Sequence, residues 1–196
     1  MSDPKKLSKA FLLFDQANSE DPNQEEYLGK TYPKELLYAM RMTERLGSYA
    51  PNAHEALQLT ARCQHIRRWE IPRDSYPMDR IGYLKWRQEL KKFHVQKASE
   101  ILKEVGYEAD IIEKVSFLLE KKQLKKNEDT QTLEDVICLV FLEFYLEPFS
   151  EKHPDEKSLE ILQKTWRKMS GKGQQAALDL PLSKKAYELV AKAIKE

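Results

Sequence analysis

Glycine is scarce in this chain, which has only six glycines among 196 residues. Tight β-hairpin turns depend on glycine, asparagine or aspartate at positions of positive φ, so the sequence offers little material for them. Hydrophobic residues instead recur at i, i+3 and i+4 along most of the chain, which is the spacing of helices with one buried face. We therefore expect an all-α fold made of helices only.

Cysteines and long hydrophobic runs are also scarce. Cys63 and Cys138 lie in helical patterns without C-x-x-C spacing. This pattern predicts reduced core thiols in a reducing compartment, and neither a disulfide framework nor a zinc site. No stretch approaches the roughly 18 apolar residues of a membrane span, and no apolar run follows the N-terminal charges. We expect a cytoplasmic protein without a membrane segment.

Neither sign of charge is in excess, because 33 Lys and Arg face 32 Asp and Glu, for a net charge of +1. Nonspecific nucleic-acid binding normally needs a basic surface, so the composition argues against nucleic acid as the partner while leaving room for a local basic pocket. With 41% hydrophobic residues the chain can form one core. We predict a single domain over residues 1–196; the sequence predicts no oligomeric state.

The hydrophobic pattern divides this domain into a core and surrounding helices. It predicts helices over about 7–17, 33–47, 52–69, 79–105, 110–119, 130–146, 155–169 and 183–195. The segment over about 130–146 is apolar on every side between Val136 and Leu142, as expected of a buried central helix in a bundle. The predicted core covers about 33–146, with the N-terminal helix (within 5–18) and the C-terminal helices (155–196) packed around it.

The strongest candidate for a functional site is an arginine-rich segment at the end of the third predicted helix. Arg62, Arg67, Arg68 and Arg73 lie within twelve residues of one another, beside His65. Positive charge next to a buried stretch requires anionic partners. Two interpretations stay open: structural salt bridges, with candidates Glu44, Glu70, Asp74 and Glu134, or an anionic ligand, above all phosphate.

A second inward-pointing histidine is predicted on the long fourth helix. His94 shares a face with Ala98, Ile101 and Val105, at offsets typical of one helix face. Its imidazole should therefore point to the core. A hydrogen-bonded core histidine and a ligand-binding histidine are both compatible with this position.

Acidic residues open the apolar central helix. Glu134 and Asp135 follow Gln131 directly before the buried turns. Their position at a helix start is itself favourable for carboxylates. Burial of the next turns nevertheless places at least one of them near the interior, where a carboxylate needs a metal or an arginine. We favour Asp135 as the inward one.

The order of these features resembles the HD-domain phosphohydrolases, in which a helix ends in His-Asp and Ile-Pro soon follows. That frame is occupied here by Gln-His-Ile-Arg-Arg-Trp-Glu-Ile-Pro over residues 64–72. His94 is similar to a further histidine of that superfamily, and Asp135 to its last acidic ligand. The first ligand histidine would fall near Tyr38, so the four-ligand set is broken.

More closely, nearly the full chain resembles the family catalogued as domain of unknown function 4202. The residues that carry this resemblance are Asp15–Asn23, Tyr38–Thr43, Gln64–Arg73, Tyr76-Pro77, Arg80–Arg87, His94, Lys121 and Gln131–Asp135. The family supplies no established activity. The chemical predictions therefore come from the HD resemblance.

That resemblance implies an HD-like, metal-assisted hydrolase of a phosphorylated small molecule or nucleotide. Its divalent ion (Mn, Fe, Mg or Zn) would be held by His65, His94 and Asp135, with Glu134 as a further candidate. Asp135 and Lys121 would be catalytic. The residues expected to bind substrate are Gln64, Arg67, Arg68, Trp69, Arg73, Arg80, Arg87 and Gln131.

Two alternative functions remain open. A non-catalytic domain that binds an anionic metabolite or nucleotide for regulation would account for the lost ligands. The third possible function is that of an RNA-associated module. It is based on an aromatic and basic run that could cover a bound nucleotide or simply pack the helix: Tyr76, Arg80, Tyr83, Trp86 and Arg87. The hydrolase prediction requires His65, His94 and Asp135 to meet in space.

Overall fold

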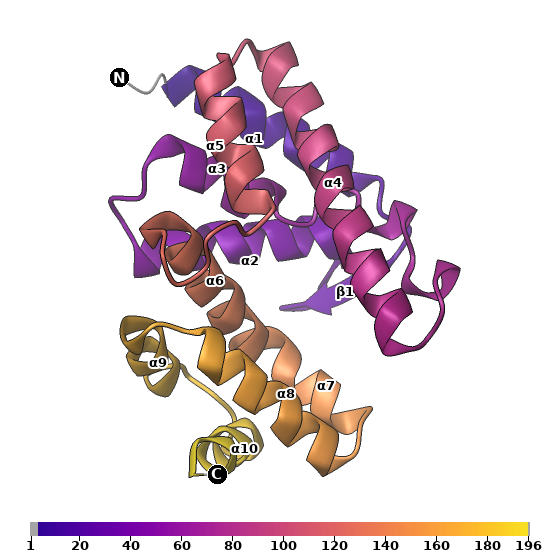
Figure 1. The fold of residues 1–196 in the computed structure, drawn as a ribbon, viewed down its shortest axis with the longest axis vertical. Coiled ribbons are helices and arrows are strands. Elements are labelled where there is room, and N and C mark those ends of the chain that lie inside the picture. Colours follow the sequence, from indigo (N-terminus) through magenta and orange to yellow (C-terminus); the bar gives the residue numbers. More distant parts are fainter. Residues whose placement is uncertain (1–3, 196) are drawn as a thin grey trace. The chain divides into compact units, whose positions relative to one another are not determined.

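The computed structural model describes residues 4–195, which Figure 1 shows as a ribbon. These residues form ten α-helices and one two-stranded hairpin, so the all-α prediction is confirmed apart from the hairpin. The elements are α1 (Pro4–Ser19), β1 (Gln24–Tyr27), β2 (Lys30–Pro33), α2 (Lys34–Tyr49), α3 (Glu55–Cys63), α4 (Arg80–Val105), α5 (Ala109–Leu119), α6 (Glu128–Val140), α7 (Leu146–Glu151), α8 (Asp155–Lys168), α9 (Gly171–Leu178) and α10 (Lys184–Lys195).

The chain folds as two compact units, each with a hydrophobic core of its own. The first unit comprises the residues up to Glu44 together with Asn52–Lys122. The second comprises Arg45–Pro51 and the residues from Gln123 onward. Cys63 is buried in the first and Cys138 in the second, and neither forms a disulfide, as predicted. Within the described residues, no helix is long and apolar enough to cross a membrane.

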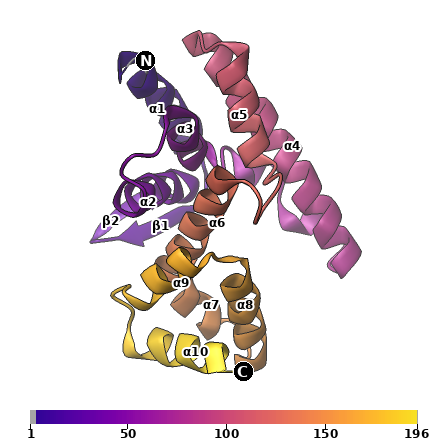
Figure 2. The same ribbon diagram turned by 60° about the vertical axis from the view of Figure 1, so that its left-hand side comes forward.

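The core of the first unit is built by α1, α3, α4 and α5. Both ribbon views show α4 and α5 running side by side (Figure 1, Figure 2). The side chains at the centre of this core are Phe14, Leu59, Ile66, Leu102 and Val115. α4 begins after Asp79, whose carboxylate accepts a hydrogen bond from the N–H of Gly82, and ends at Gly106 with a φ of 90°. The predicted start and end of this helix are thus confirmed.

The core of the second unit is built around α6. Eight of the 13 residues of α6 are buried, including the consecutive residues 133–136, which confirms the predicted burial of this helix. A π-helical turn over Phe141–Tyr145 joins α6 to α7, so the predicted helix over 130–146 is interrupted by one widened turn. Figure 2 shows α7, α8, α9 and α10 gathered beside the end of α6. Their core side chains include Leu139, Leu142, Leu146, Leu162 and Val190.

The hairpin corrects the expectation of helices only. β1 and β2 pair antiparallel, with Tyr27 opposite Lys30, so that Leu28 and Gly29 form a two-residue turn. Both turn residues have positive φ, 50° at Leu28 and 73° at Gly29, which is the turn whose twist matches a hairpin. The turn was missed because leucine is not a residue that signals a left-handed conformation.

Two helix boundaries are also wrong in the sequence-based prediction. α3 is capped by His54, not Asn52, and ends at Cys63 instead of reaching Trp69. It cannot continue because Arg67 adopts a left-handed φ of 50°. Residues 171–178 were expected to separate helices but form α9, because the Ser170 hydroxyl accepts a hydrogen bond from the N–H of Gly173 and so starts a helix.

The hairpin turn predicts that an exposed leucine can be replaced with a gain in stability. Leu28 is 84% exposed, so Leu28→Asn removes little packing and relieves left-handed strain; it should raise the free energy of unfolding by about 0.5–1 kcal/mol. Leu12→Asn is the matched control, because it replaces an exposed leucine inside α1 and should lower stability. Urea unfolding measures both, and equal losses in the two variants would contradict the turn.

Candidate functional site

One face of α4 points into the first unit along its whole length. The buried residues of α4 recur at every fourth position over most of the helix: Gly82, Trp86, Leu90, His94, Ala98 and Leu102. His94 is only 5% exposed, so the predicted inward orientation of its imidazole is confirmed. Its face contains Leu102 instead of the expected Ile101 and Val105, which are half-buried.

Two side chains of α4 hold the loop that follows α3. His94 Nδ1 lies 2.9 Å from the carbonyl oxygen of Ile66, and Trp86 Nε1 donates to the carbonyl of Ile71 at 2.8 Å. Since a carbonyl only accepts, Nδ1 of His94 carries the proton and Nε2 is unprotonated. Burial, reinforced by His65, lowers the pKa of His94 to about 3, so the ring is neutral.

His65, which this loop carries, lies among polar and aromatic side chains. Its ring stacks on Tyr38 with 4.1 Å between centroids and lies 6.0 Å from the ring of His94. Its Nδ1 is 3.3 Å from Glu35 Oε2, and its Nε2 is 2.8 Å from Arg68 Nη1. Because arginine only donates, the ring of His65 accepts from Arg68 at Nε2. The predicted pair of histidines is therefore brought together.

Positive charge dominates around His65. Burial lowers the pKa of His65 well below its usual value, and the charges of Arg68, Arg87 and Lys121 lower it further. Burial also lowers the pKa of Arg68, an effect that the Glu35 carboxylate opposes. Burial in turn raises the pKa of Glu35 despite Arg68. The one acid beside these cations is thus held toward its neutral form.

The other arginines of the segment have structural partners. Arg62 forms a two-point contact with Asp15, at 2.7 and 2.5 Å. Arg67 pairs with Glu20 and with Glu70, one of the acids proposed from sequence. Arg73 donates to the backbone carbonyls of residues 76, 77 and 79. Arg68 differs, because within residues 4–195 its side chain has neither a carboxylate nor a backbone carbonyl as hydrogen-bond partner, but only the ring of His65.

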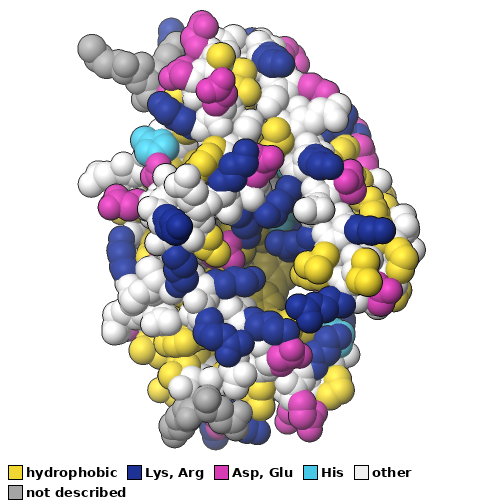
Figure 3. Space-filling view, viewed as in Figure 1, with side chains coloured by type: hydrophobic (Ala, Val, Ile, Leu, Met, Phe, Trp, Pro, Cys, Tyr) yellow, Lys and Arg dark blue, Asp and Glu magenta, His cyan; other side chains and the backbone are white. Residues whose placement is uncertain are grey.

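The residues of the aromatic and basic run differ in burial, and Tyr83 and Arg80 are exposed. Trp86 is buried, and the guanidinium of Arg68 lies 5.1 Å from its ring centroid, whereas Arg67 lies over Trp69. Arg80 is exposed and Arg87 half-buried. Figure 3 shows hydrophobic side chains gathered over the start of α4 and the loop before it, where the exposed residues are Met78, Ile81, Tyr83 and Leu84.

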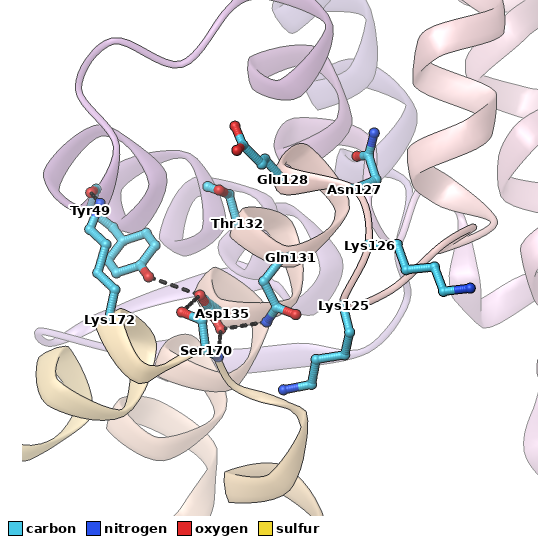
Figure 4. Close-up of a pocket in the computed structure, with 10 residues that line it drawn as sticks. All are labelled: Tyr49, Lys125, Lys126, Asn127, Glu128, Gln131, Thr132, Asp135, Ser170 and Lys172. Atoms are coloured by element: carbon cyan, nitrogen blue, oxygen red, sulfur yellow. Dashed lines mark hydrogen bonds between the residues drawn. The ribbon is translucent and has the colours of Figure 1, made fainter.

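In the second unit, Asp135 is the centre of a hydrogen-bond cluster (Figure 4). Its carboxylate accepts from Gln131 Nε2 at 2.9 Å, from the Ser170 N–H at 2.8 Å, from Ser170 Oγ at 2.5 Å and from the Tyr49 hydroxyl at 2.8 Å. Each carboxylate oxygen therefore has two donors. Both predicted acids are buried, Asp135 at 1% and Glu134 at 3% exposure, so the choice between them was unnecessary.

The side chains of the first unit do not fit a metal ion at His65. Both ring nitrogens of His65 already have polar neighbours, the guanidinium of Arg68 and the carboxylate of Glu35. Across residues 4–195, no group of three or more His, Cys, Asp and Glu is arranged to hold an ion. His65 and His94 belong to the first unit, Glu134 and Asp135 to the second. Their meeting at one ion stays a prediction, as do the catalytic roles of Asp135 and Lys121.

Sequence reasoning missed several residues of both clusters. Glu35 and Tyr38 lie three residues apart at the start of α2, and both are buried. Their polar groups on a buried helix face were the available signal. In the second unit, Ser170 before Gly171 and Gly173 was read as a linker, although serine is a preferred helix cap.

A family model described as Domain of unknown function (DUF4202) matches residues 8–190. The chain belongs to this family. The match covers both compact units, so a single DUF4202 domain includes the His65 and the Asp135 clusters. Neither the curated proteins nor the solved structures contain a match to the chain. The resemblance to HD phosphohydrolases stays a prediction.

The Asp135 cluster predicts that Gly173 cannot be replaced. A Cβ at this position would lie 2.6 Å from Cγ of Asp135, so Gly173→Ala must displace the buried carboxylate and should cost about 1–3 kcal/mol of stability. Gly171→Ala is the control in the same helix, because a Cβ there meets nothing within 4 Å. Thermal and urea unfolding compare the two. If Gly173→Ala is as stable as Gly171→Ala, the close approach is refuted.

The two neutral histidines predict a loss of stability in mild acid. Because the folded-state pKa values of His65 and His94 are lowered, the unfolded chain binds more protons below its histidine pKa of about 6.5. Stability should therefore fall as the pH drops from about 6.5 toward 3, by up to about 1.4 kcal/mol per pH unit for each histidine. Urea unfolding across this range tests it. His94→Gln should flatten the slope, and an unchanged slope would mean that His94 titrates normally.

Proposed function

We propose that the first unit binds a small phosphorylated molecule through Arg68. The observation that carries this proposal is a partly buried guanidinium without a carboxylate partner in the described residues, held against neutral His65 and the ring of Trp86. A desolvated cation normally requires a counter-ion. Among the described residues Arg68 donates a side-chain hydrogen bond through Nη1 only, so the rest of its fork remains available for an oxyanion.

The surroundings of Arg68 favour a multiply charged anion. Arg87, Lys121 and Lys34 all add positive potential at His65, whereas burial keeps Glu35 toward its neutral form. A phosphate group matches both the charge and the planar fork of arginine. Gln64, at 6% exposure, has a buried Oε1 without a donor in the described chain. A hydroxyl group or water beside the phosphate would satisfy such an acceptor.

The regulatory function and the hydrolase function both require binding of a phosphorylated small molecule. The RNA-associated function has less support. Stacking of a base requires an accessible aromatic face. Trp86 is buried and already faced by Arg68, so the exposed Tyr83 would have to supply that face. The net charge of +1 also supplies no general attraction to a polyanion. A phosphorylated small molecule is the ligand class we favour.

Arg68→Gln tests the proposal directly. Binding of nucleoside phosphates, sugar phosphates and inorganic phosphate is measured by calorimetry at fixed ionic strength, and the variant should weaken the tightest ligand about tenfold or more. Arg80→Gln is the control, because Arg80 is an exposed arginine of the same unit, at the start of α4. If no ligand depends on Arg68, or if both variants weaken binding equally, the proposal fails.

The stability of the same variants separates a ligand site from a structural role. Removing an uncompensated charge should leave the ligand-free stability of Arg68→Gln unchanged or raised. Arg62→Gln breaks the two-point contact with Asp15 and should cost about 1–3 kcal/mol. A comparable loss in Arg68→Gln would mean that Arg68 is structural.

Hydrolysis of the bound phosphate ester is a second candidate function, favoured by the position of Glu35. This buried carboxyl group lies 3.3 Å from His65 Nδ1, and burial raises its pKa. A carboxyl group kept protonated can donate a proton to a leaving alkoxide, as general acids do.

Phosphate release from the same ligands, with and without Mn²⁺, Mg²⁺ and Fe²⁺, tests hydrolysis. Elemental analysis of the purified protein tests the metal separately. Turnover that is lost in Glu35→Gln while ligand affinity persists would support this function. Binding without any turnover would leave the regulatory function alone.

A further inference from the structure

The second unit contains a polar cavity of about 350 Å³ beside the Asp135 cluster. This volume is within the range of about 300–1,000 Å³ that is typical of small-molecule pockets. All of its lining residues belong to the second unit. The residues that matter for its chemistry are Tyr49, Lys125, Lys126, Gln131, Asp135 and Lys172.

Two lysines are held in fixed positions at this cavity. Lys125 Nζ donates to the carbonyl of Met169 at 2.8 Å, and Lys172 Nζ donates to the carbonyl of Tyr49 at 3.1 Å while lying 4.3 Å over its ring. Figure 4 shows the two lysines on opposite sides of Asp135 and Gln131. An ammonium group has three donors, so each retains donors for a ligand. Binding costs less entropy when such groups are already positioned.

The acids of the cavity do not neutralise these lysines. The four acceptor positions of Asp135 are taken by its neighbours in the cluster, and no salt bridge links Lys125, Lys126 or Lys172 to a carboxylate in residues 4–195. Glu128 is the one other acid in the lining. Positive charge therefore faces the cavity, and an anion is the complementary ligand.

The side chain of Gln131 indicates that the ligand of this cavity also carries a hydrogen-bond donor. Its Nε2 donates to Asp135 Oδ1 at 2.9 Å and to the carbonyl of Lys168 at 3.0 Å, and these two acceptors fix the orientation of the amide. Its buried Oε1 then has no donor within the described residues. A ligand that carries a hydroxyl group as well as an acid group would satisfy both features.

The loop that supplies Lys125 is held in a strained conformation. Gln123 and Lys125 have φ values of 56° and 73°, which cost non-glycine residues about 1–2 kcal/mol each. The N–H groups of Lys126 and Asn127 both donate to the carbonyl of Gln123 and stabilise this bend. Such strain is often retained where a loop positions a ligand-binding group.

From these observations we infer that the cavity is a second anion site, which binds a small hydroxylated phosphate ester with its phosphate between Lys125 and Lys172. The cavity is lined by residues of the second unit, whereas Arg68 belongs to the first, and the ligands of the two need not be the same molecule. A small phosphate ester and a small hydroxylated carboxylate both carry an anionic group and a hydroxyl group. A ligand of each kind is therefore needed to tell which of the two the cavity binds.

The test uses the full chain and three probes: glycerol 3-phosphate, inorganic phosphate and glycerate. Backbone NMR spectra, recorded at constant ionic strength, should show saturable shifts at Tyr49, Ser170 and Lys172 with glycerol 3-phosphate. Lys125→Gln/Lys172→Gln should weaken this binding about tenfold or more. Both lysines are exposed, so the variant should fold, and unfolding curves verify that it does.

The control replaces two exposed lysines of α10, Lys184→Gln/Lys192→Gln, and removes the same charge from the same unit. It should leave the affinity within about twofold. Equal weakening in the α10 control would mean unspecific screening and overturn the site. Stronger binding of glycerate than of glycerol 3-phosphate, or no saturable shift with any probe, would overturn the phosphate assignment.

Discussion

The first unit depends on the hydrogen bond between the buried ring of His94 and the carbonyl of Ile66. Together with the hydrogen bond from Trp86 to the carbonyl of Ile71, this bond holds both ends of the irregular segment over residues 66–71 against α4. The segment could not hold its shape alone, because Arg67 within it has a left-handed backbone. Once its ends are fixed, His65 and Arg68 have defined positions. The geometry of the candidate site is thus set by side chains that do not need to touch a ligand.

These two hydrogen bonds also explain why positive charge exceeds negative charge around His65. Helices α2 and α4 and the segment between α3 and α4 each bring polar groups to one place, and most of these are cations. In this unit Arg62 has a carboxylate partner in Asp15 and Arg73 has backbone acceptors, whereas Arg68 and Arg87 form no salt bridge with a carboxylate in residues 4–195. These unbalanced cations are a local exception in a chain with nearly equal numbers of acids and bases. Exceptions of this kind mark functional sites more often than stable cores.

The sequence predicted those features that depend on neighbouring residues. The bounds of α4 were predicted over about 79–105, and the inward position of His94 followed from helical spacing. The hairpin was missed because Leu28 takes a conformation that its side chain disfavours. The contact of His65 with Tyr38 and Glu35 joins α2 to the segment after α3, and no local pattern specifies it. Helices and their buried faces were thus predictable, whereas partners across elements were not.

Asp135 and Arg68 show how the surroundings of a buried charge separate structural from functional roles. Both were singled out as charges that need partners. Asp135 has four donors from three residues of its own unit, so its charge is already stabilised and its removal should damage the fold. Arg68 has a neutral ring and an aromatic face instead, which position a guanidinium without neutralising it. A carboxylate with full coordination by protein donors has little capacity left for an ion or substrate, whereas a positioned cation without a counter-ion retains most of its capacity to bind one. This difference is why we propose the binding function for the arginine and not for the acid that the HD resemblance had favoured.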